Sequence, residues 1–143
     1  MIPAIVDASV AVKWFVEDVL SEQAVATINR YDFFAPSLIL VETANGLWKY
    51  ARRGDMVIED CREAIGRLPG FVRTTPDEDL VEEAMALSVT FDHPAYDCLY
   101  LVLASRLSLP LLSADKRLLA LATKSGGWRV IDLATLPPNG DTE

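Results

Sequence analysis

Four acidic residues each end or interrupt an apolar stretch of the chain, and carboxylates in such surroundings point to chemistry. They are Asp7, Glu42, Asp97 and Asp115. If they converge, two unit charges about 4 Å apart repel by about 4 kcal/mol at an effective dielectric near 20, so protons or cations must compensate. Oxygen ligands without histidine or thiolate suit Mg²⁺ or Mn²⁺. Such ions activate water and stabilise charge on a phosphodiester during its displacement.

Taken singly, each acid also has a structural explanation. Asp7 and Asp115 are placed to cap the helices that follow them, and for either residue alone we favour capping. Glu42 and Asn45 lie three residues apart on one helix face, which suits the exposed side of an amphipathic helix. Asp97 is harder to explain in this way, although the N-terminus of its helix would satisfy a first-turn acid. Its helix is apolar on nearly every side, which predicts burial all round.

Short apolar runs alternate along the chain with segments of helical periodicity. This alternation predicts an α/β fold with parallel strands, right-handed crossovers and helices on both faces of the sheet. Open sheets of this kind place their sites outside the carboxyl ends of the strands, where Asp7 and Asp115 fall. Expected strands are 2–6, 32–35, 71–75, 109–112 and 128–131, and expected helices are 8–16, 21–30, 36–53, 55–68, 76–90, 95–107 and 115–124.

The 143 residues favour one compact domain, which we place at 1–136, followed by a flexible tail at 137–143. No apolar run is long enough to span a membrane, and the N-terminus resembles no secretory signal. Cys61 and Cys98 form no CxxC pair, which fits a reducing cytoplasm. The single histidine, His93, excludes HExxH zinc chemistry. The net charge of −8 argues against a nonspecific nucleic-acid coat.

Four sequence blocks carry a family resemblance, and they contain the four acids. VDASVAVKWFVED, PSLILVETANGLW, YDCLYLVLA and LLSADKRL, in this order, resemble the signature blocks of the PIN-domain family, in particular its VapC-type toxins. These toxins are the ribonucleases of bacterial type II toxin–antitoxin pairs. The resemblance covers residues 5–131. It implies a five-stranded parallel sheet sandwiched by helices and Mg²⁺- or Mn²⁺-dependent endoribonuclease activity.

The resemblance also assigns roles to residues. It makes Asp7 and Asp97 the principal direct metal ligands, and Glu42 and Asp115 ligands that bind directly or through water. Ser113 falls where the family has a hydroxyl that supports the site, although a helix cap is an equal alternative. Ser9 is either a cap or a hydrogen-bond partner of the ligands, and Asn45 matches an ExxN pattern in which it would orient Glu42. The resemblance further implies a homodimer and a cognate antitoxin, whose C-terminal segment would bind a groove near the active site and place a basic side chain among the acids.

The sequence leaves two interpretations open for the basic residues near the acids. Lys13, Lys116 and Arg117 lie in helices that begin at the acids, so RNA contact and plain solvation are about equally favoured. His93 precedes Pro94 and is expected as a turn residue. A place in the core or at a protein interface is expected for Trp14, Phe15, Trp48 and Tyr50.

Two alternative functions would use similar residues. A Mg²⁺-binding signalling module of the phosphoacceptor type has this length and fold class, but it needs adjacent acids after the first strand. Here Asp7 is followed by Ala8 and Ser9. The other alternative is a binding module that keeps the fold without catalysis, and the complete set of acids argues against it. With water as the nucleophile, the expected cleavage products carry a 5′-phosphate and a 3′-hydroxyl.

Overall fold

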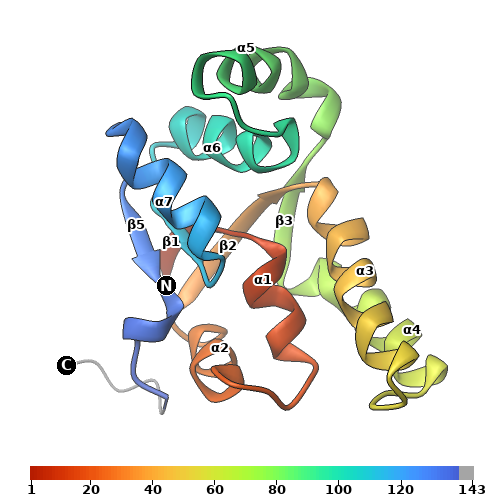
Figure 1. Ribbon diagram of the computed structural model, residues 1–143. Helices are drawn as coiled ribbons and strands as arrows, with labels where there is room; N and C mark the ends of the chain where they lie inside the picture. The colour runs from red at the N-terminus through yellow and green to blue at the C-terminus, as the bar shows by residue number, and fades with distance from the viewer. Residues whose placement is uncertain (139–143) are drawn as a thin grey trace.

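The structure is a computed structural model that describes residues 1–138. Five parallel strands form one sheet in the order β3-β2-β1-β4-β5 (Figure 1). This confirms the predicted central sheet, and the strand bounds are β1 (Ile2–Val6), β2 (Tyr31–Pro36), β3 (Val72–Thr75), β4 (Leu111–Ser113) and β5 (Val130–Asp132).

Helices connect the strands and cover the sheet (Figure 1). The longest of them, α3, packs against α4, and this pair extends away from the sheet. No helix within residues 1–138 combines the length and apolar character needed to span a bilayer. The α-helices are α1 (Ala8–Ala11), α2 (Ser21–Thr27), α3 (Leu38–Arg52), α4 (Ile58–Arg67), α5 (Val81–Phe91), α6 (Ala95–Leu107) and α7 (Lys116–Ser125). Short 3-10 turns are η1 (Val12–Trp14), η2 (Leu68–Gly70), η3 (Asp77–Asp79) and η4 (Leu133–Thr135).

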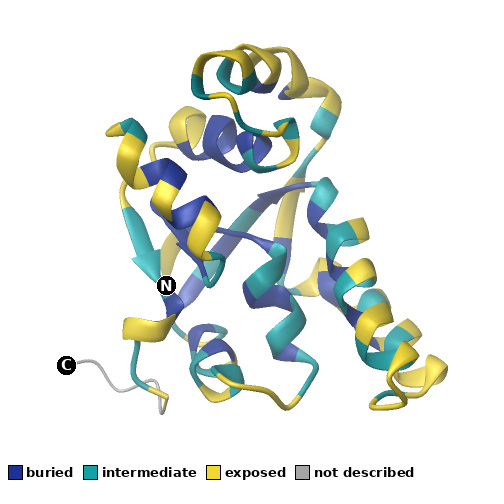
Figure 2. Cartoon of the chain, viewed as in Figure 1, coloured by how far each residue is buried: buried dark blue, intermediate teal, exposed yellow. Residues whose placement is uncertain are grey.

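The core is formed by the sheet and the helices packed on it, and α6 contributes the longest buried stretch (Figure 2). Seven consecutive residues of α6, from Cys98 to Ala104, are buried. This confirms the prediction of a helix buried all round, and the physical reason is that α6 contacts the sheet on one side and α5 on the other. The first turn of α6, which carries Asp97, is less buried, so the helix delivers an acid from a rigid element to its edge.

Several local predictions differ from the structure. The helix expected at 8–16 ends at Ala11 and continues as the 3-10 turn η1. Ser9 does not cap it, because the Ser9 hydroxyl bonds to other groups described below. Asp7 occupies the N-cap position, but its side chain makes no capping hydrogen bond, so the predicted capping role of Asp7 is not observed. The expected tail at 137–143 falls largely on residues 139–143, which lie outside the described residues.

Three apolar side chains on helices α2 and α5 are exposed. Val25, Val81 and Met85 keep 49%, 49% and 58% of their surface accessible. Helical periodicity predicts an apolar face but not which part of that face the rest of the chain covers. Val81 and Met85 lie on α5, the helix that packs against α6 at the outside of the fold (Figure 1).

The strand order places a topological switch point between β1 and β4. From β1 the chain builds toward β2 and β3 on one side, and later toward β4 and β5 on the other. Connections therefore leave β1 and β4 in opposite directions, and sheets of this kind bind ligands outside the carboxyl ends of the two strands at such a point. Asp7 directly follows β1, and Asp115 follows β4 by two residues.

Candidate active site

Asp7 lies at this switch point, directly after β1, and is only 5% exposed. Its Oδ1 accepts a hydrogen bond of 2.7 Å from the Ser9 hydroxyl. The same Ser9 oxygen accepts the Ala114 N–H at 2.9 Å and lies 3.3 Å from the Ser113 hydroxyl. Ser9 therefore links the end of β1 to the end of β4, which fixes two of the four predicted acids relative to each other.

Asp115 is the N-cap residue of α7, so the capping explanation holds for it. Its Oδ1 accepts the N–H groups of Arg117 at 2.9 Å and Leu118 at 3.4 Å. Ser113, which is fully buried, accepts the Asp115 N–H at 2.9 Å. Capping engages one carboxylate oxygen, so it does not exclude a second role for the other.

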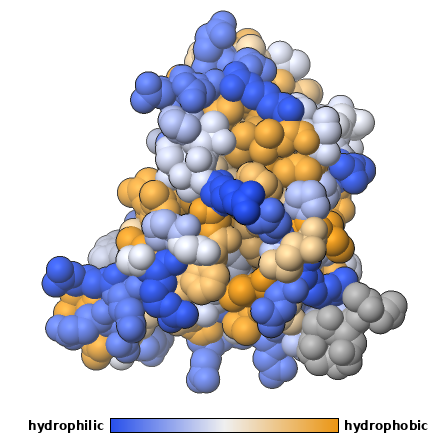
Figure 3. Space-filling view, turned by 180° about the vertical axis from the view of Figure 1, so that it is seen from behind, coloured by the Kyte–Doolittle hydropathy of each residue, from blue (hydrophilic) through white to orange (hydrophobic). Residues whose placement is uncertain are grey.

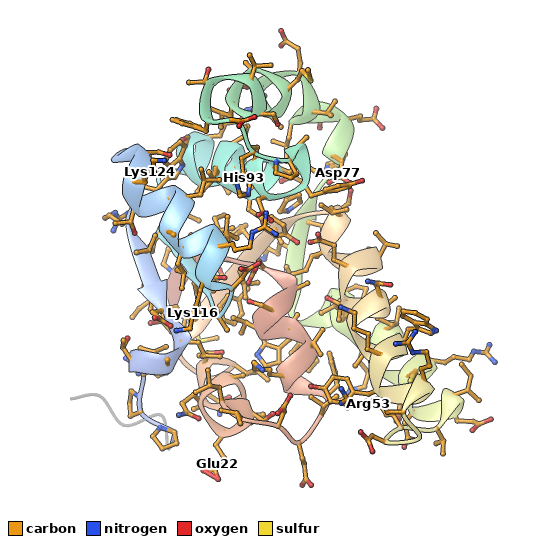
Figure 4. All side chains as sticks on the ribbon, viewed as in Figure 1. Glu22, Arg53, Asp77, His93, Lys116 and Lys124 are labelled. Carbon is orange, nitrogen blue, oxygen red and sulfur yellow. The ribbon has the colours of Figure 1, made fainter. Side chains whose placement is uncertain are left out.

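Asp97 is paired with the histidine that sequence reasoning set aside. The Nε2 atom of His93 lies 2.7 Å from Asp97 Oδ2, and the two side chains are 13% and 24% exposed. Figure 4 shows His93 beside α6. The sequence contained one indication of this pairing: His93 and Asp97 are four residues apart, the spacing of neighbours on a helix surface. Pro94 between them favoured a turn instead.

Glu42 lies on α3 and is held by a residue from α6. The hydroxyl of Tyr100 donates a hydrogen bond of 2.6 Å to Glu42 Oε1. Asn45 is exposed, and within residues 1–138 its side chain makes no hydrogen bond, so the structure does not bring it to Glu42 as the ExxN pattern suggested. Tyr100 is the side chain that holds Glu42 instead. The sequence did not predict this contact, because no local pattern connects residues that are 58 positions apart.

Two features fix the N-terminal half of α3. Asp77, labelled in Figure 4, accepts the Leu38 N–H at 2.9 Å and donates its own N–H to the Ser37 hydroxyl at 3.1 Å. Gly46 faces η1 so closely that a Cβ there would overlap a methyl group of Val12. Glycine thus allows α3 to lie against η1, and this packing sets the position of Glu42 one helical turn away.

Burial and neighbouring charges raise the pKa of two of the four acids. Burial raises the pKa of Asp7 to about 7, against the lowering effect of the Ser9 and Ser113 hydroxyls, and the charges of Asp115 and Glu42 raise it further. Burial also raises the pKa of Glu42, against the Tyr100 hydrogen bond, and the charges of Asp97 and Asp115 add to the increase. The charges of the other acids therefore reach Asp7 and Glu42.

The carboxylates do not close on one point in the conformation described. Across residues 1–138, no three His, Cys, Asp or Glu side chains are arranged to hold a metal ion. Each of the four predicted acids instead has one oxygen engaged by a donor within the chain. At least one side chain must therefore move if three of these acids are to meet a single cation.

The predicted basic residues lie at different distances from this cluster. Lys116 and Arg117 are exposed on the first turn of α7, next to Asp115, and Figure 4 shows Lys116 at the start of that helix. Lys13 lies on η1, beyond the C-terminal end of α1. The pKa of Asp18 is lowered mainly by a hydrogen bond from Tyr50 and to a smaller extent by the charge of Lys13, so Lys13 lies on the Asp18 side of the fold. Lys116 and Arg117 are thus better placed than Lys13 to meet a ligand at the acids.

A separate groove of about 1260 Å³ opens beyond the C-terminal end of η1. It runs between α2 and the α3–α4 pair, and none of the four acids lines it. Its lining includes the aromatic side chains Trp14, Phe15 and Tyr50. Six acidic residues also line the groove, compared with two basic ones, Arg53 and Arg67. The groove is therefore suited to a positively charged occupant.

Comparisons with known proteins agree on one family. A sequence profile of the PIN domain matches residues 4–124, a span that includes all four acids. The chain is 29% identical over 118 residues to Ribonuclease VapC3 of Pyrobaculum aerophilum, covering 80% of this chain and 90% of that protein.

Two solved structures share the fold. PAE2754 from Pyrobaculum aerophilum superposes with a TM-score of 0.68 at 23% identity, over 94% of this chain and 92% of that one. A chain of a toxin–antitoxin complex from Klebsiella pneumoniae superposes with a TM-score of 0.63 at 17% identity, over 91% of this chain and 97% of that one. With the profile spanning most of its length, the chain belongs to the PIN domain family.

Proposed function

We propose that this protein is a metal-dependent endoribonuclease that acts as the toxin of a toxin–antitoxin pair. The observation that carries the proposal is that Asp7 and Asp115 follow the central strands β1 and β4 of a parallel sheet, near enough to the other acids that Asp115 and Glu42 raise the pKa of Asp7, and Asp97 and Asp115 that of Glu42, in addition to the larger effect of burial. Similarity to a VapC ribonuclease over most of both chains supports the reaction class.

The donor set fits Mg²⁺ or Mn²⁺. Four carboxylates from four segments present oxygen atoms only, which these ions prefer. Burial, and to a smaller extent repulsion among the acids, raises the pKa of Asp7 and Glu42, and a cation would relieve the repulsion. Asp7 and Asp97 would hold the ion directly, and Glu42 and Asp115 directly or through water. When bound, the ion supplies charge stabilisation to a phosphodiester and lowers the pKa of water.

The remaining roles belong to the chain itself. Ser9 and Ser113 hold the end of β1 against the end of β4, so that Asp7 and Asp115 keep their relative positions. Lys116 and Arg117 flank the acids and would contact the RNA phosphates on either side of the scissile bond. The exposed positions of both side chains leave them free to adjust to a flexible single strand.

The experiment that tests this function maps the ends of RNA fragments. With Mg²⁺ and purified protein, we expect fragments that carry 5′-phosphate and 3′-hydroxyl ends, and we expect EDTA to stop their formation. Ends bearing 2′,3′-cyclic phosphate would contradict the proposal, since they indicate attack by the RNA's own 2′-hydroxyl. This outcome is a sharp alternative here because a histidine, His93, lies beside Asp97. Stable labelling by acetyl phosphate, without cleavage, would favour the signalling module.

The acidic groove supports the antitoxin as a second partner. Its aromatic floor and excess of acids match a segment that is basic and partly apolar. We expect the protein encoded beside this gene to bind there with a salt-sensitive affinity. Glu63→Lys, which reverses a groove charge, should weaken binding about tenfold, whereas Glu59→Lys, on the same helix but outside the groove, should change it less than about threefold. Calorimetric titration measures both, and equal effects of the two variants would contradict the assignment.

The exposed apolar face of α5 supports the homodimer. Val81, Met85 and Val89 follow one another at four-residue spacing and are 49%, 58% and 72% exposed, and Tyr96 beyond them is 64% exposed. In Figure 3, hydrophobic side chains gather in the upper part of the molecule, at the height of α5 and α6. A contiguous apolar surface of this kind is typical of an interface with another protein.

A further inference from the structure

Tyr100 is one of the largest fully buried side chains, at 1% exposure, yet its hydroxyl reaches a carboxylate of the candidate site. It stands within the seven-residue buried stretch of α6, three residues after Asp97. Residues three apart on a helix share a face, so Asp97 and Tyr100 point toward the same side of α6. The Tyr100 hydroxyl therefore lies beneath the acid cluster rather than in the apolar core alone.

The chemistry of the two groups fixes the direction of this contact. A phenol carries one O–H donor, whereas an ionised carboxylate has acceptors only, so the Tyr100 hydroxyl donates to Glu42 Oε1. The contact with Glu42 Oε1, at 2.6 Å, is thus a charge-assisted bond whenever Glu42 is ionised.

Among the hydrogen bonds that the structure gives to the four acids within the described chain, the one to Glu42 spans the largest sequence separation, 58 residues. Asp7 is held by Ser9, two residues away, and Asp97 by His93, four residues away. Asp115 is held by N–H groups of its own helix. Glu42 also has one more rotatable bond than an aspartate, so its carboxylate is the least defined by its own backbone.

We propose that Tyr100 is a positioning residue for Glu42. By engaging Oε1, it holds the carboxylate of α3 next to α6, where Asp97 begins, and leaves Oε2 for a cation. The proposal rests on the proposed function, because it gives Glu42 a ligand role. Tyr100, a buried residue of α6, would thus orient Glu42, the role that the ExxN pattern suggested for Asn45.

The test removes one oxygen atom. Tyr100→Phe deletes the hydroxyl and keeps the ring, so the packing of α6 is retained. We measure Mn²⁺ binding to the full chain by electron paramagnetic resonance, with circular dichroism to verify folding. Removing a group that orients a metal ligand typically costs 10- to 100-fold in metal affinity, and we expect about tenfold here. Tyr31→Phe, a second buried tyrosine at the opposite end of the sheet, is the matched control and should bind Mn²⁺ like the wild type.

A double-mutant cycle separates positioning from a general structural effect. Glu42→Ala should itself weaken Mn²⁺ binding, and Tyr100→Phe added to it should cause no further loss, because its partner is gone. Wild-type affinity in Tyr100→Phe, or a further tenfold loss in the double variant, would overturn the inference while the proposed function stands. A wild-type chain that binds no Mn²⁺ would overturn the metal-dependent function, and the inference with it.

Discussion

Replacing Asp7 with asparagine is expected to reduce Mg²⁺-dependent RNA cleavage at least about a hundredfold, which corresponds to a loss of about 3 kcal/mol of transition-state stabilisation. Asp7 is the deepest of the four acids, at 5% exposure, and it feels the charges of both Asp115 and Glu42. Asparagine keeps the shape and the oxygen that accepts from Ser9, but it removes the negative charge that would hold a cation. Cleavage rates on one defined RNA, measured against Mg²⁺ concentration, give the effect.

The matched control is Asp32→Asn, the same chemical change at the opposite edge of the sheet. Asp32 lies near the start of β2 and forms an exposed ion pair with Arg73 at 3.6 Å. Such pairs contribute little, so cleavage should be unchanged. Full activity in the Asp7 variant would show that the reaction does not depend on this carboxylate and would remove Asp7 from the candidate site. Equal losses in both variants would indicate a general effect on folding.

The same Asp7→Asn change is expected to stabilise the protein when no divalent ion is present. Burial raises the pKa of Asp7 to about 7 from its ordinary 3.8. Between pH 4 and 7 the folded chain therefore keeps a proton that the unfolded chain has released, so the free energy of unfolding falls as the pH rises through this window. Above pH 7 the penalty is complete, and its upper limit is about 4 kcal/mol.

Urea unfolding in EDTA at several pH values tests this prediction. Asparagine carries no charge, so the variant escapes the penalty: its gain should be near zero at pH 4, grow toward pH 7, and level off above it at up to about 4 kcal/mol. Asp32→Asn makes the same chemical change at a partly exposed carboxylate and serves as the control for the substitution itself. A gain that is equal at pH 4 and pH 8 would contradict the assignment to the buried charge of Asp7.

Together the two results would describe one trade-off. The buried carboxylate of Asp7 would destabilise the folded chain without an ion and bind the cation when one is present. Added Mg²⁺ should therefore narrow the stability gap between the wild type and the Asp7 variant, since a ligand stabilises only the folded state that binds it. This sets Asp7 apart from Asp115, whose cap bonds to α7 stabilise the fold without any ion.

The sequence by itself determined the architecture. Apolar runs of strand length between helical segments imply a parallel sheet with crossovers, because only that arrangement buries the runs on both faces. It also determined that Asp7 and Asp115 lie at the carboxyl edge, since both follow strands directly or nearly so. The burial of α6 was predictable because a helix that is apolar on all sides has no face to give to water.

Only the tertiary structure decided what each acid contacts. Tyr100 meets Glu42 across 58 residues, and Ser9 accepts a bond from Ala114 across 105. Periodicity describes one element at a time, whereas these contacts depend on strand order and on how closely helices approach. Gly46 shows the reason: the absence of one Cβ lets α3 lie against η1, and that distance places Glu42 within reach of Tyr100. The local pattern thus specifies the ligands, and long-range packing specifies the partners that orient them.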